Sequence, residues 1–283
     1  MRPKEAGAFV RLVRSVSTHA PVLGVRGWLQ WLLYRIRTRF QVFPPRVVKI
    51  HPRSLLHPVE IRAGTSSDRI VFVQVVLGAE YSPLNPVEPV FILDLGANIG
   101  LSSAWFLSRF PRATVLAVEP DPDNYAMCCK NVSRYGQRAR VLLGAVWSKR
   151  TKLALCRGSF RDGREWATQV RDCVAYAADI QVDSWDIGSL IELSNATAID
   201  LLKVDIERAE LEVFAKGHNQ WLPLVRNICI ELHDTDCEEV FFAALTNYEY
   251  DLSRSGELTI CRNLRPTRLT TENANIGGGV QLT

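Results

Sequence analysis

The stretch that decides the fold is Phe91-Ile92-Leu93-Asp94-Leu95-Gly96-Ala97-Asn98-Ile99-Gly100-Leu101. Its first residues form a continuous apolar run, which is typical of a strand buried on both faces of a parallel sheet. Gly96 and Gly100 predict a tight turn, and the residues from Leu101 to Phe110 predict a helix. A glycine turn between a strand and a helix lets backbone N–H groups and the positive end of the helix dipole approach a ligand. The stretch therefore predicts a nucleotide-binding corner.

The next strand indicates which cofactor this corner binds. The glycine turn reads G-x-N-x-G, which differs from the G-x-G-x-x-G of dinucleotide-binding folds. A strand that ends in Asp-x-Gly is typical of enzymes that bind S-adenosyl-methionine. A second apolar strand, 113–118, is followed by Glu119, at the spacing of about twenty residues where a carboxylate accepts ribose hydroxyls. We therefore predict that Glu119 binds the ribose; the alternative is a solvated acid at a strand end.

The predicted cofactor-binding residues lie in the glycine turn and at the ends of the second and third strands. They are Asp94, Gly96, Ala97, Asn98, Gly100, Glu119, Pro120, Asp121 and Ala145. Many enzymes of this kind place an acid near the end of the third strand, where it meets the adenine amino group. This chain has none there, so we expect backbone and apolar contacts to hold the adenine, with Val146 and Trp147 beside Ala145.

Composition places the chain among globular proteins. With 283 residues, 47% hydrophobic and 23% charged, it can bury the core of one large α/β domain with appendages. No apolar run approaches the roughly 20 residues that cross a bilayer, and a secretory signal is not expected. Seven cysteines without a C-x-x-C spacing predict reduced thiols in a reducing compartment. We therefore expect a cytoplasmic location, with peripheral membrane contact as an open alternative.

Basic residues gather at the N-terminus. Residues 1–53 hold eleven Lys or Arg against the single acid Glu5, a balance of +10, whereas the remainder holds 23 basic and 29 acidic residues, a balance of −6. Residues 27–40 predict an amphipathic helix. Three interpretations stay open: Trp28, Trp31 and Leu32 pack on the following domain, the helix contacts an anionic membrane surface, or the segment is an organellar transit peptide. Nucleic-acid binding is not expected, because no recognisable module accompanies the charge.

Two further regions interrupt the regular alternation of strands and helices. Residues 43–89 are rich in proline and predict a cap that shapes the substrate entrance, with Tyr81 as a lid or a packing residue. Residues 147–182 predict a hairpin of strands at 153–156 and 180–182, joined by the polar loop 158–170. A loop of this length inside a compact domain is usually functional or mobile.

Acidic residues follow the fourth and fifth predicted strands. The fourth ends in Asp205-Ile206-Glu207 and the fifth in Ile230-Glu231-Leu232-His233. Ligands of an open α/β sheet bind beyond the carboxyl ends of its strands, and the period of two in a strand places Glu231 and His233 on the same side. The predicted catalytic residues are therefore His233, Asp205, Glu231 and Glu207; the alternative is that they have structural roles.

At these residues the chain resembles the FkbM-type S-adenosylmethionine-dependent methyltransferases. The matching segments are Asp94-Leu95-Gly96-Ala97-Asn98-Ile99-Gly100, 119–125 with Asn131, Leu202-Lys203-Val204-Asp205-Ile206-Glu207 with Ala209-Glu210, and 230–233. The resemblance covers about residues 55–262. With the order of strands and helices, it implies an α/β fold: a doubly wound, Rossmann-like methyltransferase sheet, mostly parallel, with a C-terminal antiparallel hairpin and helices on both faces. We predict a basic arm at 1–53, a methyltransferase catalytic domain at 54–265 and a flexible tail at 266–283.

The resemblance implies methyl transfer from S-adenosyl-L-methionine, usually to an oxygen of a small hydroxylated acceptor such as a sugar or a polyketide. A neutral hydroxyl is a poor nucleophile, so a base or a metal has to manage its proton. One hypothesis makes His233 the base, with Asp205 or Glu231 orienting it or the acceptor. The other places Mg²⁺ between Asp205, Glu207 and Glu231. The sequence alone assigns no metal ligands, so Mg²⁺ stays an open alternative.

One residue departs from the family pattern. Arg208 stands where the family usually has a glycine between the glutamate and the alanine. This change predicts an altered acceptor choice, a contact with an anionic acceptor, or a weakened site. Two other classes of protein stay open: a non-catalytic binding module of the same fold that acts through its basic arm, and a nicotinamide-dependent oxidoreductase, which the glycine spacing disfavours.

Overall fold

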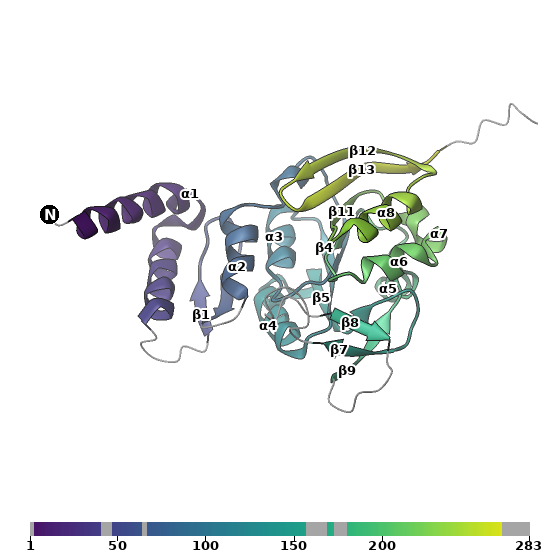
Figure 1. Ribbon diagram of the computed structural model, residues 1–283, viewed down its shortest axis with the longest axis horizontal. Helices are drawn as coiled ribbons and strands as arrows, with labels where there is room; N and C mark the ends of the chain where they lie inside the picture. Colours follow the sequence, from purple (N-terminus) through teal and green to yellow (C-terminus); the bar gives the residue numbers. More distant parts are fainter. Residues whose placement is uncertain (1–2, 41–46, 64–66, 157–168, 173–179, 268–283) are drawn as a thin grey trace, which may run out of the picture.

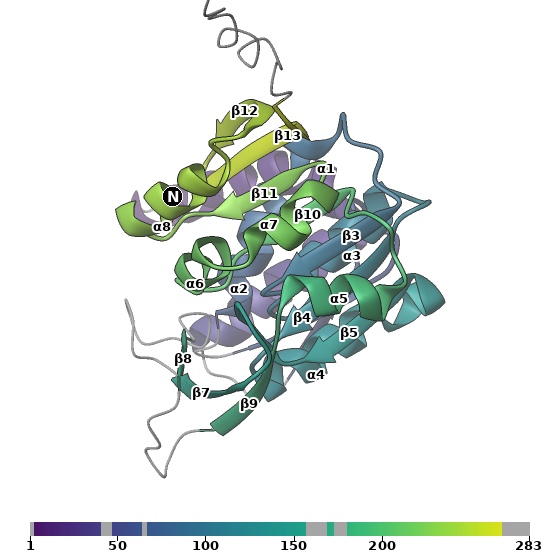
Figure 2. The ribbon, with the colours of Figure 1, turned by 90° about the vertical axis from the view of Figure 1, so that its right-hand side faces the viewer.

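A central sheet organises the computed structural model, which describes residues 3–40, 47–63, 67–156, 169–172 and 180–267. Seven strands lie in the order β12-β13-β11-β10-β3-β4-β5. Their bounds are Phe91–Leu95 (β3), Thr114–Glu119 (β4), Ala139–Leu143 (β5), Leu201–Val204 (β10), Ile228–Glu231 (β11), Tyr248–Ser255 (β12) and Leu258–Pro266 (β13). The five strands from β11 to β5 pair in parallel, and β13 and β12 complete the sheet in antiparallel pairs (Figure 2). The predicted sheet and its C-terminal hairpin are confirmed.

Helices cover both faces of this sheet (Figures 1 and 2). One face carries α1 (Pro3–Phe40), α2 (Asp68–Phe72), α3 (Leu101–Arg109) and α4 (Pro122–Val132), whose buried side chains share one apolar core. The other carries α5 (Ile187–Ser194), α6 (Glu210–Ala215), α7 (His218–Trp221) and α8 (Thr235–Ala244), around a second core. The strands between these cores are apolar on both faces because both faces are buried. All five residues of β3 are buried, as the apolar run predicted.

Short helical turns complete these layers. A π-helical turn at Val73–Leu77 continues α2, and 3₁₀ turns lie at Ser82–Leu84, Ser133–Arg138 and Leu222–Leu224. Residues 70–76 are therefore helical. Helix α6 begins only at Glu210, because Glu207 and Arg208 take left-handed backbone angles with φ of 50° and 76°.

A small second sheet lies beside the main one. It joins β6 (Ala145–Val146), β9 (Ile180–Trp185), β7 (Lys152–Cys156) and β8 (Gln169–Asp172) in that order. The antiparallel pairing of β7 with β9 confirms the predicted hairpin, and β8 adds a strand on its other side. Most of the predicted loop 158–170, and the predicted tail beyond residue 267, lie outside the described residues.

The N-terminal arm packs on the domain through part of α1. Trp31 is buried, and its ring stacks on Tyr34 and on Phe72 of α2 at centroid distances of 5.2 and 4.9 Å. The helix contains Pro21 and is interrupted at Gly24, whose φ is 65°. The antiparallel pair of β1 (Val47–Ile50) with β2 (Val59–Arg62) spans the boundary predicted after residue 53. None of the helices in the described ranges combines the length and the apolar character that a bilayer crossing requires.

Candidate active site

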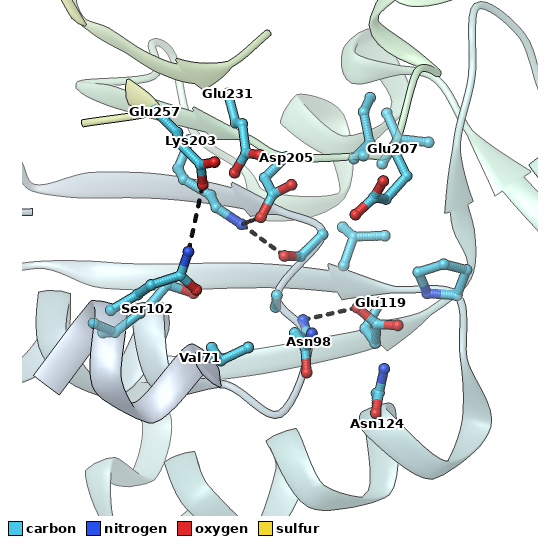
Figure 3. Close-up of a pocket in the computed structure, with 18 of the residues that line it drawn as sticks. Val71, Asn98, Ser102, Glu119, Asn124, Lys203, Asp205, Glu207, Glu231 and Glu257 are labelled. Carbon is cyan, nitrogen blue, oxygen red and sulfur yellow. Dashed lines mark hydrogen bonds and ion pairs between the residues drawn. The ribbon is translucent and has the colours of Figure 1, made fainter. Parts of the chain in front are cut away.

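A cavity of about 320 Å³ opens at the carboxyl ends of β3, β4, β10 and β11. This is the edge of an open α/β sheet at which ligands bind. In Figure 3, Asp205, Glu207 and Glu231 lie toward one end of the cavity, and Asn98, Glu119 and Asn124 toward the other. The cavity therefore has two chemically distinct ends, and each comes from a different pair of strands.

The structure places most of the predicted site residues at this cavity. Among the lining residues are Gly96, Ala97, Asn98, Glu119, Pro120, Ala145, Asp205, Glu207 and Glu231. Val146 also lines it beside Ala145, whereas Trp147 packs with the small second sheet. Asp94, Gly100, Asp121 and His233 are not among the lining residues. Direct contact with a ligand stays a prediction for all of these residues.

The glycine turn is held against the neighbouring strand. Gly96 has a φ of 74°, and a Cβ added there would lie 1.7 Å from the carbonyl oxygen of Asp205, so no larger residue fits. Gly100 has a φ of 80°, and its added Cβ would lie 2.8 Å from the Cys128 sulfur on α4. Both glycines are thus required by backbone angle and by close approach. Asn131 secures the same turn, because its side chain donates to the carbonyl of Ile99 at 2.8 Å.

Asp94 serves the interior of the protein. Its Oδ2 accepts hydrogen bonds from the hydroxyls of Ser102 and Ser103 at 2.7 and 2.6 Å. Its Oδ1 lies 3.3 Å from the Lys203 ammonium, which donates to the carbonyl of Gly96 at 2.6 Å. Burial alone would lower the pKa of Lys203, but the charges of Asp94 and Asp205 raise it above its ordinary value. Lys203 therefore stays charged, and its hydrogen bond to the carbonyl of Gly96 holds the glycine turn in place.

Lys203 was not among the predicted site residues, although the sequence carried a signal for it. A lysine inside an otherwise apolar strand is rarely buried without a charged partner. Helix α2 and the turn after it are also part of the wall, through Ile70, Val71 and Gln74. These residues belong to the region 43–89, and its role in shaping the substrate entrance stays a prediction. Tyr81 borders the cavity and packs on Phe106 with a centroid distance of 5.0 Å.

Glu119 faces the cavity with its carboxylate nearly covered. It accepts hydrogen bonds from the backbone N–H groups of Asn98 and Asp121 at 2.8 and 3.0 Å. Burial raises the pKa of Glu119 to about 7, although the two N–H groups pull it down. Asp121 itself caps α4 by accepting from the N–H groups of Asp123 and Asn124. Glu119 therefore stands at the glycine turn with lone pairs left for a ligand.

The opposite end carries an acidic cluster, formed by Asp205, Glu207, Glu210 and Glu231 around His233. Nε2 of His233 lies 3.4 Å from Glu207, 3.6 Å from Asp205 and 3.8 Å from Glu231, and Nδ1 lies 3.3 Å from Glu210. The His233 side chain has no exposed surface. The two strand ends β10 and β11 thus bring the predicted catalytic residues together.

Charge in the acidic cluster bears on the base role predicted for His233. Burial alone would lower the pKa of His233, but the contacts with Glu207 and Glu210 and the charge of Asp205 raise it to about 11. Burial, and then the charge of Asp205, raise the pKa of Glu231 to about 8. Without a metal ion in the cluster, a pKa this high keeps the ring protonated, and His233 is not among the residues that line the cavity. The base role of His233 stays a prediction.

Arg208 turns away from the cavity. Its Nε lies 2.9 Å from the carboxylate of Asp234, which caps α8 by accepting from the N–H of Cys237. Its φ of 76° is a left-handed conformation that glycine takes without strain and other residues rarely adopt. Arg208 thus has an unusual backbone conformation, and its side chain forms an ion pair with Asp234. It does not line the cavity, so the structure gives no support for a contact with an anionic acceptor.

The comparison with protein families gives the identity of the domain. The model of the Methyltransferase FkbM domain matches residues 94–253, which is more than half of the chain. This range contains the glycine turn, Glu119 and the acidic cluster. The chain belongs to the FkbM methyltransferase family.

Several relatives and solved structures are similar to parts of this chain. Methyltransferase 1 of Beauveria bassiana is 24% identical over 51% of this chain and 65% of its own. The 31-O-demethyl-FK506 methyltransferase FkbM of Streptomyces tacrolimicus is 27% identical over 54% and 68%. The chain spans only 9% of AmbE, an antimetabolite synthetase of Pseudomonas aeruginosa that is 28% identical over 58% of this chain. A methyltransferase structure from Geobacter sulfurreducens matches 65% of this chain and 76% of its own with a TM-score of 0.37 and 12% identity.

The backbone at Arg208 yields a prediction that two matched variants separate. Arg208→Gly and Arg208→Ala both lose the ion pair with Asp234, but only glycine relieves the left-handed backbone angle. We expect Arg208→Gly to have the higher free energy of unfolding, by about 1 kcal/mol. Chemical denaturation of the two variants measures this difference. Equal stabilities would contradict the strained conformation.

Proposed function

We propose that the chain is an S-adenosyl-L-methionine-dependent methyltransferase that methylates a hydroxyl group of a small molecule. The observation that carries this proposal is the Glu119 carboxylate, which stands beside the glycine turn at one end of a cavity whose other end is the acidic cluster. Membership of the FkbM family supports methyl transfer. The name of the Streptomyces tacrolimicus relative, a 31-O-demethyl-FK506 methyltransferase, supports oxygen as the methylated atom.

The lining residues fit the cofactor in three places. Glu119 would accept hydrogen bonds from the ribose hydroxyls, the backbone of Gly96 to Asn98 would border the methionine part, and Ala145 with Val146 would border the adenine. When bound, the cofactor supplies a methyl group activated by a positively charged sulfur. Holding that methyl group in line with an acceptor oxygen provides much of the rate acceleration of such a displacement.

The acidic end of the cavity fits an uncharged or cationic acceptor. Besides Glu119, the lining acids are Glu80, Asp205, Glu207, Glu231 and Glu257, and Lys203 is the lining cation among the described residues. Such a field disfavours an anionic acceptor. A carboxylate of the acidic cluster would take the proton of the acceptor hydroxyl as the methyl group is transferred to its oxygen. In this scheme His233 positions the carboxylates, and the base role of His233 stays a prediction.

The ribose contact makes cofactor binding dependent on pH. Because the pKa of Glu119 is about 7, the carboxylate is mostly protonated at pH 6 and mostly ionised at pH 8. Ribose hydroxyls donate to the ionised form, so we expect the affinity for S-adenosyl-homocysteine to fall by up to about tenfold from pH 8 to pH 6.

Calorimetric titration of the wild type and of Glu119→Gln at both values of pH measures this effect. The variant should bind weakly and with little dependence on pH. A folded wild type that binds neither the cofactor nor its product would contradict the proposal and favour the non-catalytic binding module. Binding of a nicotinamide cofactor instead would favour the oxidoreductase.

A second proposal concerns the surface of the arm. The apolar side chains of Val25, Leu29, Leu33 and Ile36 are 44–78% exposed along one stripe of α1. The exposed cations Arg26, Arg35 and Arg37 lie on the same stretch of helix, and the sequence has no acid between Glu5 and Glu60. This combination is typical of a helix that lies on an anionic membrane surface. Contact with nucleic acid is not part of this proposal, and the cytoplasmic location stays a prediction.

Sedimentation with lipid vesicles tests the arm. We expect the protein to bind phosphatidylserine-containing vesicles more tightly than neutral ones. Leu29→Glu should weaken this binding at least about tenfold, because burying one leucine is worth about 1.5 kcal/mol or more. The matched control is Leu252→Glu, since Leu252 is 50% exposed on β12, away from the arm. Equal losses in the two variants would contradict a membrane-binding surface on α1.

A further inference from the structure

His233 is buried without a satisfactory partner. Among the described residues, neither of its ring nitrogens makes a hydrogen bond of good geometry, and the side chain has no exposed surface. Oε2 of Glu207 lies 3.4 Å from Nε2 and is likewise buried without a hydrogen bond of good geometry to any described residue. Buried polar groups are nearly always satisfied in folded proteins, so each exception needs a physical explanation. The explanation has to account for a ring nitrogen that points at three carboxylates.

The spacing of these groups fits a bound cation. Asp205, Glu231 and His233 each offer a ligand atom, and these atoms all lie within 4.8 Å of one another. Ligands at about 2.1 Å from one ion stand roughly 3.0–3.5 Å apart. The separations of 3.6 and 3.8 Å from Nε2 to Asp205 and Glu231 exceed that range by only a few tenths of an ångström. A small movement of these side chains toward one another would therefore bring all three ligand atoms within bonding distance of one ion.

Charge points to the same conclusion. The acidic cluster holds four carboxylates around one imidazole, His233. Of the two other basic side chains beside it, Lys203 lies 3.7 Å from Asp205 but 3.3 Å from Asp94 and donates to the glycine turn, and Arg208 pairs with Asp234. The four carboxylates therefore outnumber the positive charges of the described residues beside them. Clustered carboxylates at a half-buried site repel one another unless a cation lies between them. A divalent ion would supply that positive charge.

We infer that Asp205, Glu231 and His233 bind a divalent transition-metal ion of the Mn²⁺ or Zn²⁺ kind. The imidazole in the ligand set argues against Mg²⁺, which prefers oxygen ligands in octahedral geometry, and in favour of an ion that accepts nitrogen and oxygen together. Glu210 faces the other ring nitrogen at 3.3 Å. A carboxylate in that place is the usual partner that orients a metal-bound histidine.

The position of the site gives the ion a role in the reaction, a consequence that rests on the proposed function. Asp205 and Glu231 line the cavity, whereas His233 lies behind them. An ion bound by all three would therefore present its remaining positions to the cavity. There it would lower the pKa of an acceptor hydroxyl and orient it. The role of His233 is then that of a ligand.

Metal titration without cofactor tests the site by itself. Full-length protein stripped with a chelator is titrated with Mn²⁺ and with Zn²⁺, and bound Mn²⁺ is followed by the loss of the free-ion electron paramagnetic resonance signal. We expect saturable binding of either ion, tighter than Mg²⁺. Glu231→Gln and His233→Ala should each weaken it at least about tenfold. Glu239→Gln, an exposed acid on α8, is the matched control and should bind as the wild type does.

The outcomes separate this inference from the proposed function. No binding by the folded wild type, or equal binding by His233→Ala, would overturn the metal site. Binding of S-adenosyl-homocysteine by the same sample would leave the proposed function intact. If His233→Ala abolishes methylation while Mn²⁺ binding is unchanged, His233 is the base and the ligand assignment is wrong. Thermal unfolding of each variant confirms that it is folded.

Discussion

The site depends on one buried ion pair between neighbouring strands. Lys203 on β10 and Asp94 on β3 face each other at 3.3 Å with almost no exposure, and the ammonium also donates to the carbonyls of Leu95 and Gly96. Removing one partner of such a pair leaves an uncompensated buried charge. The ion pair and the two hydrogen bonds therefore fix the position of the end of β3, where the glycine turn begins. Ser102 and Ser103 extend the same network into the first turn of α3.

This constraint joins the two ends of the cavity. The glycine turn and Glu119 belong to β3 and β4, whereas the acidic cluster belongs to β10 and β11. Gly96 packs so closely on the carbonyl of Asp205 that the two strand ends form one surface. Lys203 also lies 3.7 Å from the Asp205 carboxylate, so it touches both ends. If the two ends hold a methyl donor and its acceptor, as proposed, this shared wall would keep them in line.

Much of the fold could be predicted from local patterns. The apolar run into Gly96, the position of Glu119 and the acidic ends of two strands depend on residues close together in sequence, and the structure contains these elements. The departure from the family pattern at Arg208 was also recognisable from sequence, and the structure gives this residue a left-handed φ of 76°.

Other features depend on contacts between distant segments. Lys203 donates to carbonyls more than 100 residues away in sequence. The local sequence therefore showed only that a lysine lies within an apolar strand. His233 was expected to face the acceptor. The period of a strand indicates the side on which a residue lies, but it does not indicate which other segments cover that residue. Glu210, from α6, and the carboxylates of two strand ends enclose that ring. The part of the cavity wall formed by α2 likewise could not be predicted, because it depends on how distant segments pack together.

Thermal and chemical unfolding of Lys203→Met, alone and combined with Asp94→Asn, tests the central ion pair most directly. We expect the single variant to lose about 3–5 kcal/mol of the free energy of unfolding, because Asp94 is left buried and charged. Asp94→Asn should restore part of this loss, since it removes the uncompensated charge. Lys216→Met, at an exposed lysine paired with Glu212, is the matched control and should change little. A Lys203→Met variant as stable as the wild type, or two changes whose effects simply add, would contradict the account.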